Sequence, residues 1–592
     1  MPFVIPVNLC LSGRDLTEPI PSPDGVWVLV GVRNSGRSGL LLVPASGGPE
    51  RLLSVDPAPS LGRGLGGGCA DWLPDSSGFV YAASDGQVWL HRLTGDRSVL
   101  TALEPGREVS GPVVSPDGQH VAYVVDLAEV HVLSLDDPSR QHAASSGADF
   151  VIDPSWSADG SELVWHAWDV PNMAWDESYT VRCSVRAPGS STTVLRHADS
   201  QIQQPRFASD GSLWDVCDVD GWLNIRRNGV TALSEQHEHA GPTWGPGQRS
   251  YAVSPDGDAV IVNRNESGFG RLVLVELASG RVSEIAKGVH GQIRWLGNRV
   301  TALRTGGRTP TQVVSYERED STGPWQRATL AVGPVAEWSN VEQHLVEPEL
   351  IEVSTYQGAR IPARAYRPAD AAVRAEGRMI CWVHGGPTDQ WQVTFLPRIT
   401  YWVSRGWTVL VPDHRGSTGH GRSFQQAMRH GWGTVDTTDV AATIAYAQAL
   451  GWGTRSRTVL MGGSAGGYTA LNVLVSNPEL VAGAAVVYPV SDPSVLAQAT
   501  HRFEAHYNDT LVGADPVVVD PERLARPVLI LHGDQDPVVP LSQSVSLVER
   551  ATALGKDVEF HVFEGEGHGF RQPTNQASEY AFIERFVQRI AP

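Results

Sequence analysis

The serine at position 464 has the neighbours of an activated nucleophile. It lies in the run Gly462-Gly463-Ser464-Ala465-Gly466-Gly467, which follows an apolar run and precedes a stretch with helical character. This is the pattern G-x-S-x-G of a tight strand-to-helix turn, whose crowding requires small residues two positions before and after the serine. Such a turn lifts the hydroxyl clear of the sheet and directs a helix N-terminus toward developing negative charge. We therefore predict that Ser464 is the nucleophile of an acyl-transfer reaction.

Two segments farther along the chain could supply the acid and the base for this serine. Where a nucleophile sits on a turn of this type, the acid and then the histidine follow it in the chain. The apolar run 527–533 leads into Asp534 and Asp536, and a carboxylate just beyond a strand is where the acid is expected. His568 lies between glycines in the segment 565–570, on a loop that suits a base. The residue types leave the choice between the two aspartates open.

Backbone amides are the expected partners of the oxyanion that forms when a serine attacks a carbonyl. One amide belongs to the residue after the nucleophile, which is Ala465. The second comes from an early strand-to-helix loop, and the loop His384-Gly385-Gly386-Pro387 follows the first strong apolar run of this half. We expect the Gly386 amide to complete the oxyanion hole; the competing interpretation of these four residues is an ordinary turn.

Two other segments carry residue types that bind metals or phosphates. His237-Glu238-His239 lacks a third ligand and the HExxH spacing on a helix, so we interpret it as a solvated loop. The glycine-rich run 62–68 has no helix and no Lys-Ser/Thr after it, which favours a flexible loop over a phosphate site. We therefore predict no metal site, and Ser-Asp-His chemistry requires no cofactor.

The composition argues against several classes of partner. The formal net charge of −19 lacks the basic footprint of a protein that binds nucleic acid or an anionic membrane. The five cysteines are scattered without a CxxC pair, so neither a disulfide framework nor a structural zinc is expected. The N-terminus lacks a signal-peptide pattern, and no run of about 18 apolar residues occurs. We expect a cytoplasmic protein without nucleic-acid or membrane partners; a homo-oligomer is compatible with the sequence.

A short turn phrase recurs through the first half of the chain. Its most regular form is Ser-Pro-Asp-Gly, and the copies are followed by alternating apolar residues, as in 120–125. Proline presets one turn position and Asp-Gly supplies the bend and a positive φ, so each copy predicts a strand–turn–strand unit. A spacing of 42 to 51 residues is typical of a β-propeller rather than of a β-sandwich with coincidental turns. Seven copies predict seven blades, with the turn Asp or Asn at positions 24, 75, 117, 159, 210, 256 and 298.

The pattern changes near residue 345. From there, continuous apolar runs alternate with helical stretches, the runs at 379–384, 408–413, 458–463 and 527–533 and the helices at 438–450 and 467–476. Apolar strands separated by helices indicate a parallel sheet that is covered on both faces. We therefore predict an N-terminal β-propeller at residues 1–340 and a C-terminal α/β-hydrolase domain at residues 345–592, with a mainly parallel, doubly wound sheet.

Several motifs in both halves resemble the prolyl oligopeptidase family, and more narrowly its bacterial dipeptidyl aminopeptidase/acylaminoacyl peptidase branch. They include GGSAGG at 462–467, HGDQDPVVP at 532–540, GEGHGF at 565–570, HRFEAHYNDTLVG at 501–513 and, in the first half, WDVPNMAWD at 168–176. The resemblance implies a serine peptidase that cleaves short peptides, aminoacyl amides or N-acyl amides, with the propeller as a gate that restricts access. In the family motif HG-x-x-D-x-x-V-P the second carboxylate is catalytic, which selects Asp536 over Asp534.

The chain departs from the family pattern where a substrate's N-terminus would be recognised. Relatives often carry HEYGGG in the first blades, and the corresponding run here, 63–68, has Gly64 in place of the acidic residue. If that glutamate binds a free amine in relatives, Glu238 and Glu504 are the remaining candidates, and each could equally form a structural ion pair. Tyr488 is a third substrate-binding candidate. We favour an aminopeptidase or dipeptidyl peptidase; the alternatives are an acylaminoacyl peptidase and an esterase or amidase acting on a small non-peptide molecule.

Overall fold

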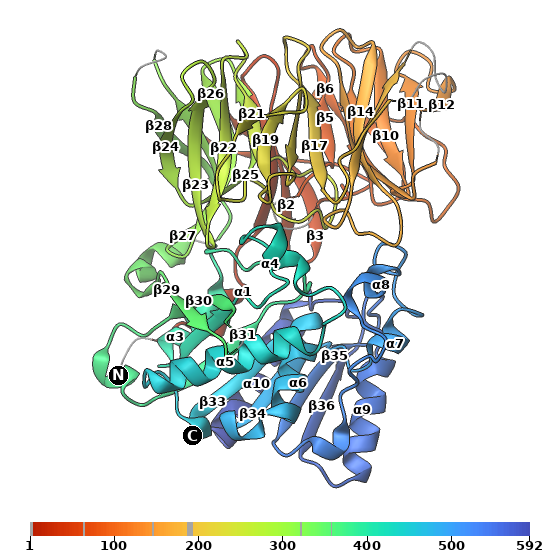
Figure 1. Cartoon of the computed structure of the whole chain (residues 1–592). Coiled ribbons are helices and arrows are strands. Elements are labelled where there is room, and N and C mark those ends of the chain that lie inside the picture. Colours follow the sequence, from red (N-terminus) through yellow and green to blue (C-terminus); the bar gives the residue numbers. More distant parts are fainter. Residues whose placement is uncertain are drawn as a thin grey trace. The chain divides into compact units, whose positions relative to one another are not determined.

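The computed structural model describes residues 4–62, 66–144, 147–185, 193–319, 323–334, 336–356 and 358–592. The chain forms two compact units, one of residues 13–334 and one of residues 335–592 together with the segment up to Ser12 (Figure 1). The second unit therefore differs from the expected domain 345–592 by including the N-terminal segment. In helix α1 (Val7–Leu11), Leu9 is buried in one apolar cluster with Trp338. This packing stabilises the helix, because a helix of five residues is not stable by itself.

Within the described residues, the first unit consists of seven four-stranded antiparallel sheets, each with its strands in sequence order. The first four sheets are β1 (Asp15–Pro21), β2 (Trp27–Asn34), β3 (Arg37–Pro44), β4 (Arg51–Leu53); β5 (Ala70–Trp72), β6 (Gly78–Ala82), β7 (Val88–Arg92), β8 (Arg97–Val99); β9 (Val109–Val114), β10 (His120–Val125), β11 (Glu129–Ser134), β12 (Gln141–Ala143); and β13 (Phe150–Trp156), β14 (Glu162–Trp168), β15 (Tyr179–Ser184), β16 (Thr193–Leu195). The last three are β17 (Ile202–Phe207), β18 (Leu213–Cys217), β19 (Asn224–Arg227), β20 (Val230–Leu233); β21 (Tyr251–Val253), β22 (Ala259–Glu266), β23 (Phe269–Glu276), β24 (Arg281–Lys287); and β25 (Val289–Leu296), β26 (Arg299–Gly306), β27 (Thr309–Glu317), β28 (Gln326–Val332).

The recurring turn phrase lies between the first two strands of every sheet, as the sequence predicts. In the first sheet the Ser22 hydroxyl donates to the Asp24 carboxylate at 2.5 Å, and the Gly25 amide donates to the Ser22 carbonyl at 2.8 Å. Gly25 has a φ of +73°, which a residue with a side chain rarely adopts. The turn chemistry therefore explains why the phrase repeats once in each sheet.

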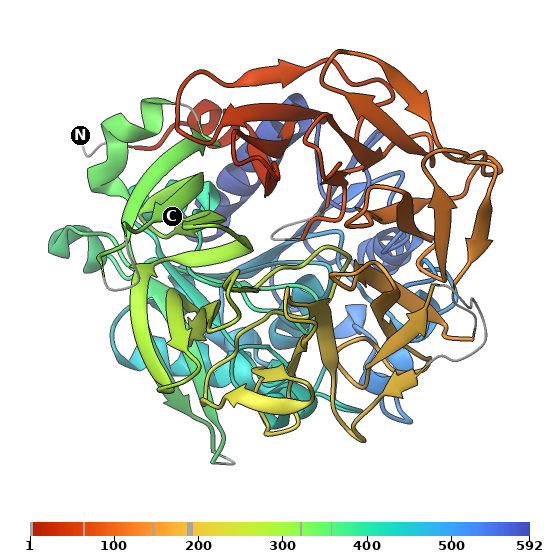
Figure 2. The ribbon, with the colours of Figure 1, turned by 90° about the horizontal axis from the view of Figure 1, so that it is seen from above.

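The seven sheets close into a ring, which Figure 2 shows in colours from red to green. Apolar side chains fill the space between successive sheets, and the ring closes where Leu16 and Val30 of the first sheet share a cluster with Leu303 and Val313 of the last. Strand β1 also contacts β25 and β26. The predicted seven-bladed β-propeller is confirmed, and the β-sandwich alternative is excluded.

The second unit contains one eight-stranded sheet with the order β29-β30-β32-β31-β33-β34-β35-β36. Strands β29, β30 and β32 pair antiparallel, and the remaining pairs are parallel. The strands are β29 (Glu349–Ser354), β30 (Arg360–Tyr366), β31 (Met379–Val383), β32 (Thr408–Pro412), β33 (Thr458–Gly463), β34 (Gly483–Val487), β35 (Val528–Gly533) and β36 (Val558–Phe563). The helices are η1 (Ala336–His344), α2 (Ala371–Arg374), α3 (Pro397–Ser404), α4 (Arg422–Gln426), α5 (Val435–Ala449), η2 (Arg455–Arg457), α6 (Ala465–Ser476), η3 (Pro478–Leu480), α7 (Pro493–Leu496), α8 (Tyr507–Leu511), η4 (Pro521–Arg523), α9 (Ser542–Ala553) and α10 (Pro573–Ile590).

Helices cover both faces of this sheet, as expected for buried parallel strands. On one face α6 contacts β31, β33 and β34, and α5 packs on α6. On the other face α3 and α10 place Trp402 and Phe586 in one apolar cluster with strand residues such as Val409. The α/β-hydrolase architecture with a mainly parallel, doubly wound sheet is therefore confirmed.

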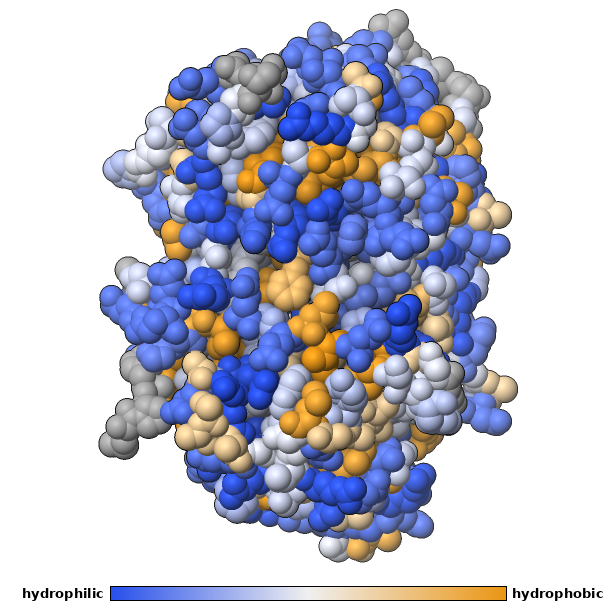
Figure 3. All heavy atoms as spheres, turned by 60° about the vertical axis from the view of Figure 1, so that its left-hand side comes forward, coloured by the Kyte–Doolittle hydropathy of each residue, from blue (hydrophilic) through white to orange (hydrophobic). Residues whose placement is uncertain are grey.

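The surface is mainly polar where Figure 3 displays it, with apolar side chains interspersed among hydrophilic ones. None of the helices in the described ranges combines the length and the apolar character that crossing a bilayer requires.

Candidate active site

Ser464 lies on the predicted tight turn between β33 and α6, with φ +56° and ψ −126°. A Cβ atom on Gly462 would lie 2.3 Å from the Gly466 carbonyl oxygen, and one on Gly466 would lie 2.3 Å from the Val383 carbonyl oxygen. Both distances are far below van der Waals contact, so both positions require glycine. The Ser464 amide donates to the Val487 carbonyl at 3.1 Å, which ties the turn to the end of β34.

The structure distinguishes the two candidate acids. Asp536 Oδ2 accepts a hydrogen bond from His568 Nδ1 at 2.7 Å, while Asp536 Oδ1 accepts from the amides of Val538 and Val539 at 2.9 and 3.0 Å. Asp534 instead accepts from the Gly565 amide at 2.7 Å. Asp536 is therefore the carboxylate that orients the histidine, and Asp534 shapes the loop that carries it.

Asp536 remains ionised at any pH at which the histidine works. Burial alone would raise the pKa of this carboxyl, but the neighbouring imidazoles of His532 and His568 and a backbone amide hold the pKa well below its usual range. Nε2 of His568 is then the nitrogen left to take a proton from the nucleophile. The Ser464 hydroxyl has no hydrogen-bond partner among the described residues; such bonds commonly tighten only when substrate is bound.

The two residues expected to supply the oxyanion amides lie beside Ser464. Gly386 and Ala465 line one pocket with Ser464, and within the described residues neither amide donates to a protein acceptor. A Cβ on Gly385 would lie 3.2 Å from the Gly463 carbonyl oxygen and 3.6 Å from Ser464 Cβ, so this loop passes close to the nucleophile and a side chain there would be tightly packed. The expected pair of oxyanion donors is thus brought together.

A buried polar network anchors the oxyanion loop. His384 Nδ1 donates to the Gly385 carbonyl at 2.9 Å, and its Nε2 is bonded to the Ser417 hydroxyl at 2.7 Å. Gln390 donates to Asp413 at 2.7 Å, and Asp413 also accepts two hydrogen bonds from the fully buried Arg364. The segment after β32 therefore fixes both ends of the loop that carries Gly386.

Asp389, in the same loop, should make stability depend on pH. Burial raises the pKa of Asp389 to about 7. A carboxyl with a raised pKa binds its proton more tightly in the folded state, so its contribution to stability falls as pH rises from about 4 to about 7. Asp389→Asn should therefore raise the thermal unfolding midpoint relative to wild type more at pH 8 than at pH 5. An equal difference at both pH values would contradict the raised pKa.

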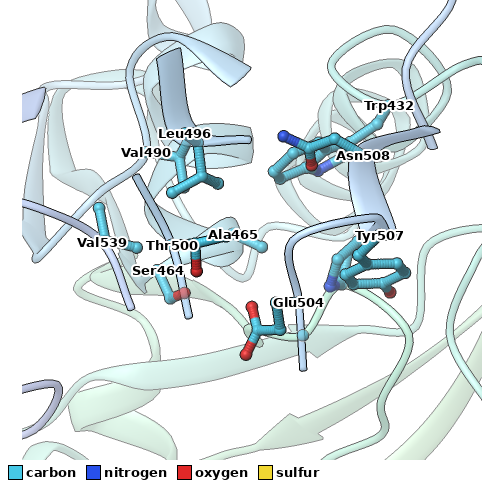
Figure 4. Close-up of a pocket in the computed structure, with 12 residues that line it drawn as sticks. Trp432, Ser464, Ala465, Val490, Leu496, Thr500, Glu504, Tyr507, Asn508 and Val539 are labelled. Carbon is cyan, nitrogen blue, oxygen red and sulfur yellow. The ribbon is translucent and has the colours of Figure 1, made fainter. Parts of the chain in front are cut away.

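The residues that line the pocket beside Ser464 all belong to the second unit (Figure 4). The pocket lining mixes apolar and polar side chains, and Glu504 supplies the one carboxylate among them. Glu504 Oε1 is 3.2 Å from His501 Nε2, and its side chain is 22% exposed. The lining residues are Gly386, Pro387, Trp432, Ser464, Ala465, Val490, Leu496, Thr500, Glu504, Tyr507, Asn508 and Val539.

The sequence indicated part of this lining. Glu504 was a candidate, and Tyr507 and Asn508 lie in the motif 501–513 that carries the family resemblance. Trp432 and Leu496 were missed, since they come from separate segments and neither stands in a recognisable pattern. Val539 lies in the motif 532–540 but was not identified as part of the lining.

The other two substrate-binding candidates lie elsewhere. Glu238 is buried in the propeller unit, where its carboxylate accepts from the Leu223 amide at 2.7 Å. The adjacent His239 is fully buried and bonded to Glu235, so the expectation of a solvated loop is wrong there. Tyr488 lies at the end of β34, with its ring centroid 4.3 Å from that of His568. Gly64 and its neighbours at 63–65 lie outside the described residues.

No cluster of three or more His, Cys, Asp or Glu side chains in the described part of the chain has the geometry to hold a metal ion. Of the glycine-rich run 62–68, the described part packs against Glu18, whose carboxylate accepts from the amides of Gly68 and Cys69 at 2.7 and 2.8 Å. These amides are thus occupied by a side chain of the propeller itself.

Residues 393–591 match the model of the prolyl oligopeptidase family. Among curated proteins, the chain is similar to dipeptidyl peptidase family member 6 of Caenorhabditis elegans, with 30% identity over 36% of this chain and 31% of the relative. It is also similar to dipeptidyl aminopeptidase BIII of Pseudoxanthomonas mexicana, with 24% identity over 47% of this chain and 44% of the relative. The alignments thus span less than half the length of these curated relatives.

Similarity to solved structures extends over both units. A puromycin-hydrolysing peptidase of Mycobacterium tuberculosis aligns with a TM-score of 0.89 and 25% identity, covering 99% of this chain and 96% of that one. A puromycin hydrolase aligns with a TM-score of 0.85 and 26% identity over the same shares of the two chains.

Proposed function

Because residues 393–591 form a domain of the prolyl oligopeptidase family, we propose that this chain is a serine peptidase that hydrolyses short peptides and aminoacyl amides. The observation that carries the proposal is the pocket in which Ser464 lies together with the two oxyanion amides. The Asp536–His568 pair, joined at 2.7 Å, follows Ser464 in the chain order that the fold requires. In this proposal, the propeller restricts access to the active site to short peptides.

The reaction proceeds through an acyl-enzyme. His568 Nε2 takes the proton of the Ser464 hydroxyl while Ser464 Oγ forms a bond to the substrate carbonyl carbon. The amides of Gly386 and Ala465 hold the negative charge on the carbonyl oxygen. The carbon–nitrogen bond then breaks, and the leaving amine departs with the proton from His568. Water, activated by the same histidine, hydrolyses the ester and restores the serine.

Within this activity we propose an aminopeptidase preference for a free amine and an apolar first side chain. Trp432, Leu496 and Val539 supply apolar walls beside the nucleophile. An ammonium group held in such a pocket needs a carboxylate, because an unpaired buried charge is costly, and Glu504 is the carboxylate available there. The two similar solved proteins are a puromycin-hydrolysing peptidase and a puromycin hydrolase. Puromycin contains an aminoacyl amide bond and a free amine.

Glu504→Gln should reduce the wild-type preference for a free amine. The amide keeps the shape of the side chain but loses the charge, so the rate with a leucyl p-nitroanilide should fall by about 10- to 100-fold, the worth of a charged hydrogen bond. The rate with the N-acetylated substrate should change little. The measurement is the ratio of kcat/KM for the free and acetylated substrates.

Glu238→Gln is the matched control, since the Glu238 carboxylate is buried and already accepts from the Leu223 amide. It should leave the ratio unchanged. If acetylation does not alter the wild-type rate, amine recognition is wrong. The acylaminoacyl peptidase and the small-molecule esterase or amidase then become the better proposals, which p-nitrophenyl esters assayed in parallel would separate.

A cytoplasmic location is also part of the proposal. All five cysteines are unpaired thiols, four of them buried, which suits a reducing compartment.

A further inference from the structure

We propose that Tyr488 is a positioning residue for His568, a role that rests on the proposed serine chemistry. The ring centroids of the two side chains lie 4.3 Å apart with an interplanar angle of 47°. This contact joins the end of β34 to the loop that carries the catalytic base.

Asp534 and the buried Glu566 hold the backbone of the loop around His568, but their hydrogen bonds do not reach the imidazole. Gly565 and Gly569 have φ values of +71° and +107°, and Gly567 lies between them. Glycine has no side chain that could pack against the ring, so the orientation of the imidazole depends on the contacts of the ring itself. The hydrogen bond to Asp536 fixes one ring nitrogen but leaves the imidazole free to tilt about that bond. An aromatic wall on one side removes much of this freedom.

The conformation of Tyr488 is strained in a way that favours this contact. Its φ is +40°, a region that large side chains avoid. Two neighbouring hydrogen bonds hold it there: the Tyr488 amide donates to the Leu531 carbonyl at 2.7 Å, and the Val487 carbonyl accepts from the Ser464 amide. The end of β34 therefore supports the nucleophile with one residue and turns the next side chain toward the base.

The nucleophile turn is shaped around the same ring. A Cβ on Gly463 would lie 3.1 Å from Tyr488 Cε2 and 3.4 Å from its Cζ and hydroxyl oxygen. This explains why the variable position before the serine in G-x-S-x-G is itself glycine here. The ring thus fills the space between the strand that carries Ser464 and the loop that carries His568.

The ring rather than the hydroxyl carries this role. Burial raises the pKa of Tyr488 to about 12, so the phenol stays neutral at any working pH. Within the described residues the hydroxyl makes no hydrogen bond, whereas the ring also meets Phe570 edge to face at 6.0 Å. Phenylalanine at this position should therefore preserve the role, and an aliphatic residue should not.

The experiment compares Tyr488→Leu with Tyr488→Phe on one p-nitroanilide. Tyr488→Leu should lower kcat by about 10- to 100-fold with little change in KM, because a mispositioned catalytic group slows the chemical step. Tyr488→Phe should match wild type within about threefold, which is our allowance for a lost hydroxyl without a partner.

Gly463→Ala provides a second route should Tyr488→Leu fold poorly. Its methyl group would press on the ring at 3.1 Å, so it should lower kcat without loss of substrate binding. The proposal is overturned if Tyr488→Leu keeps the wild-type kcat, or if Tyr488→Phe is impaired as strongly as Tyr488→Leu. A wild-type protein without hydrolytic activity would instead overturn the proposed function.

Discussion

Replacing Ser464 with alanine is expected to lower the rate of amide hydrolysis by about five to six orders of magnitude, the scale of nucleophile removal in other serine peptidases. The loss follows because no other group at the turn can form the acyl-enzyme. Folding should be unaffected, since within the described residues the hydroxyl contributes no hydrogen bond and alanine fits the same backbone. The measurement is kcat with a p-nitroanilide, together with the thermal unfolding midpoint.

Ser476→Ala is the control for this variant, because Ser476 lies exposed at the last residue of the same helix. It should keep near-wild-type activity. If Ser464→Ala retained more than about one thousandth of the wild-type activity, well above the residual activity expected, the chemistry would have to be assigned to another group.

Asp536→Asn is expected to lower kcat by about four orders of magnitude, as in the corresponding substitution of a Ser-His-Asp triad. The carboxylate accepts a hydrogen bond from His568 Nδ1 at 2.7 Å. An amide at this position can donate instead, which favours the tautomer whose Nε2 carries the proton and cannot accept one from serine. The negative charge that stabilises the imidazolium is also lost. The measurement is kcat across the pH range in which wild type is active.

Asp534→Asn is the matched comparison, two residues away on the same loop. Asp534 is bonded to the Gly565 amide rather than to the histidine, so its loss should cost no more than about tenfold, the worth of one ordinary hydrogen bond. Equal losses in the two variants, or a larger loss in Asp534→Asn, would reverse the assignment of the acid.

Much of the fold could be predicted because its signals are local. Each propeller turn is specified by a few adjacent residues, and the Asp24 turn shows the serine bond and the positive-φ glycine that the phrase predicts. The buried strands of the second unit could also be predicted, because each is a continuous apolar run of adjacent residues. The N-terminal segment was assigned to the wrong unit, because a five-residue helix that packs on Trp338 has no pattern of its own.

The site could be predicted only where chain order or glycine spacing specifies it. Ser464 and His568 follow from such patterns, whereas the choice of Asp536 needed the family resemblance. The pocket could not be predicted in the same way, since its lining comes from segments around positions 386, 432, 464, 490–508 and 539. The contact between Tyr488 and His568 depends on a positive φ at Tyr488, which could not be predicted because tyrosine rarely adopts that conformation.

The central claim is that Ser464 forms the covalent intermediate of this hydrolase. A fluorophosphonate probe, which reacts with activated serines, tests it most directly when peptide mapping by mass spectrometry locates the label. We predict one label per chain on Ser464, with hydrolysis lost in proportion to labelling. A label on a different residue that accompanies the loss of activity, or full labelling of Ser464 with activity retained, would contradict the account.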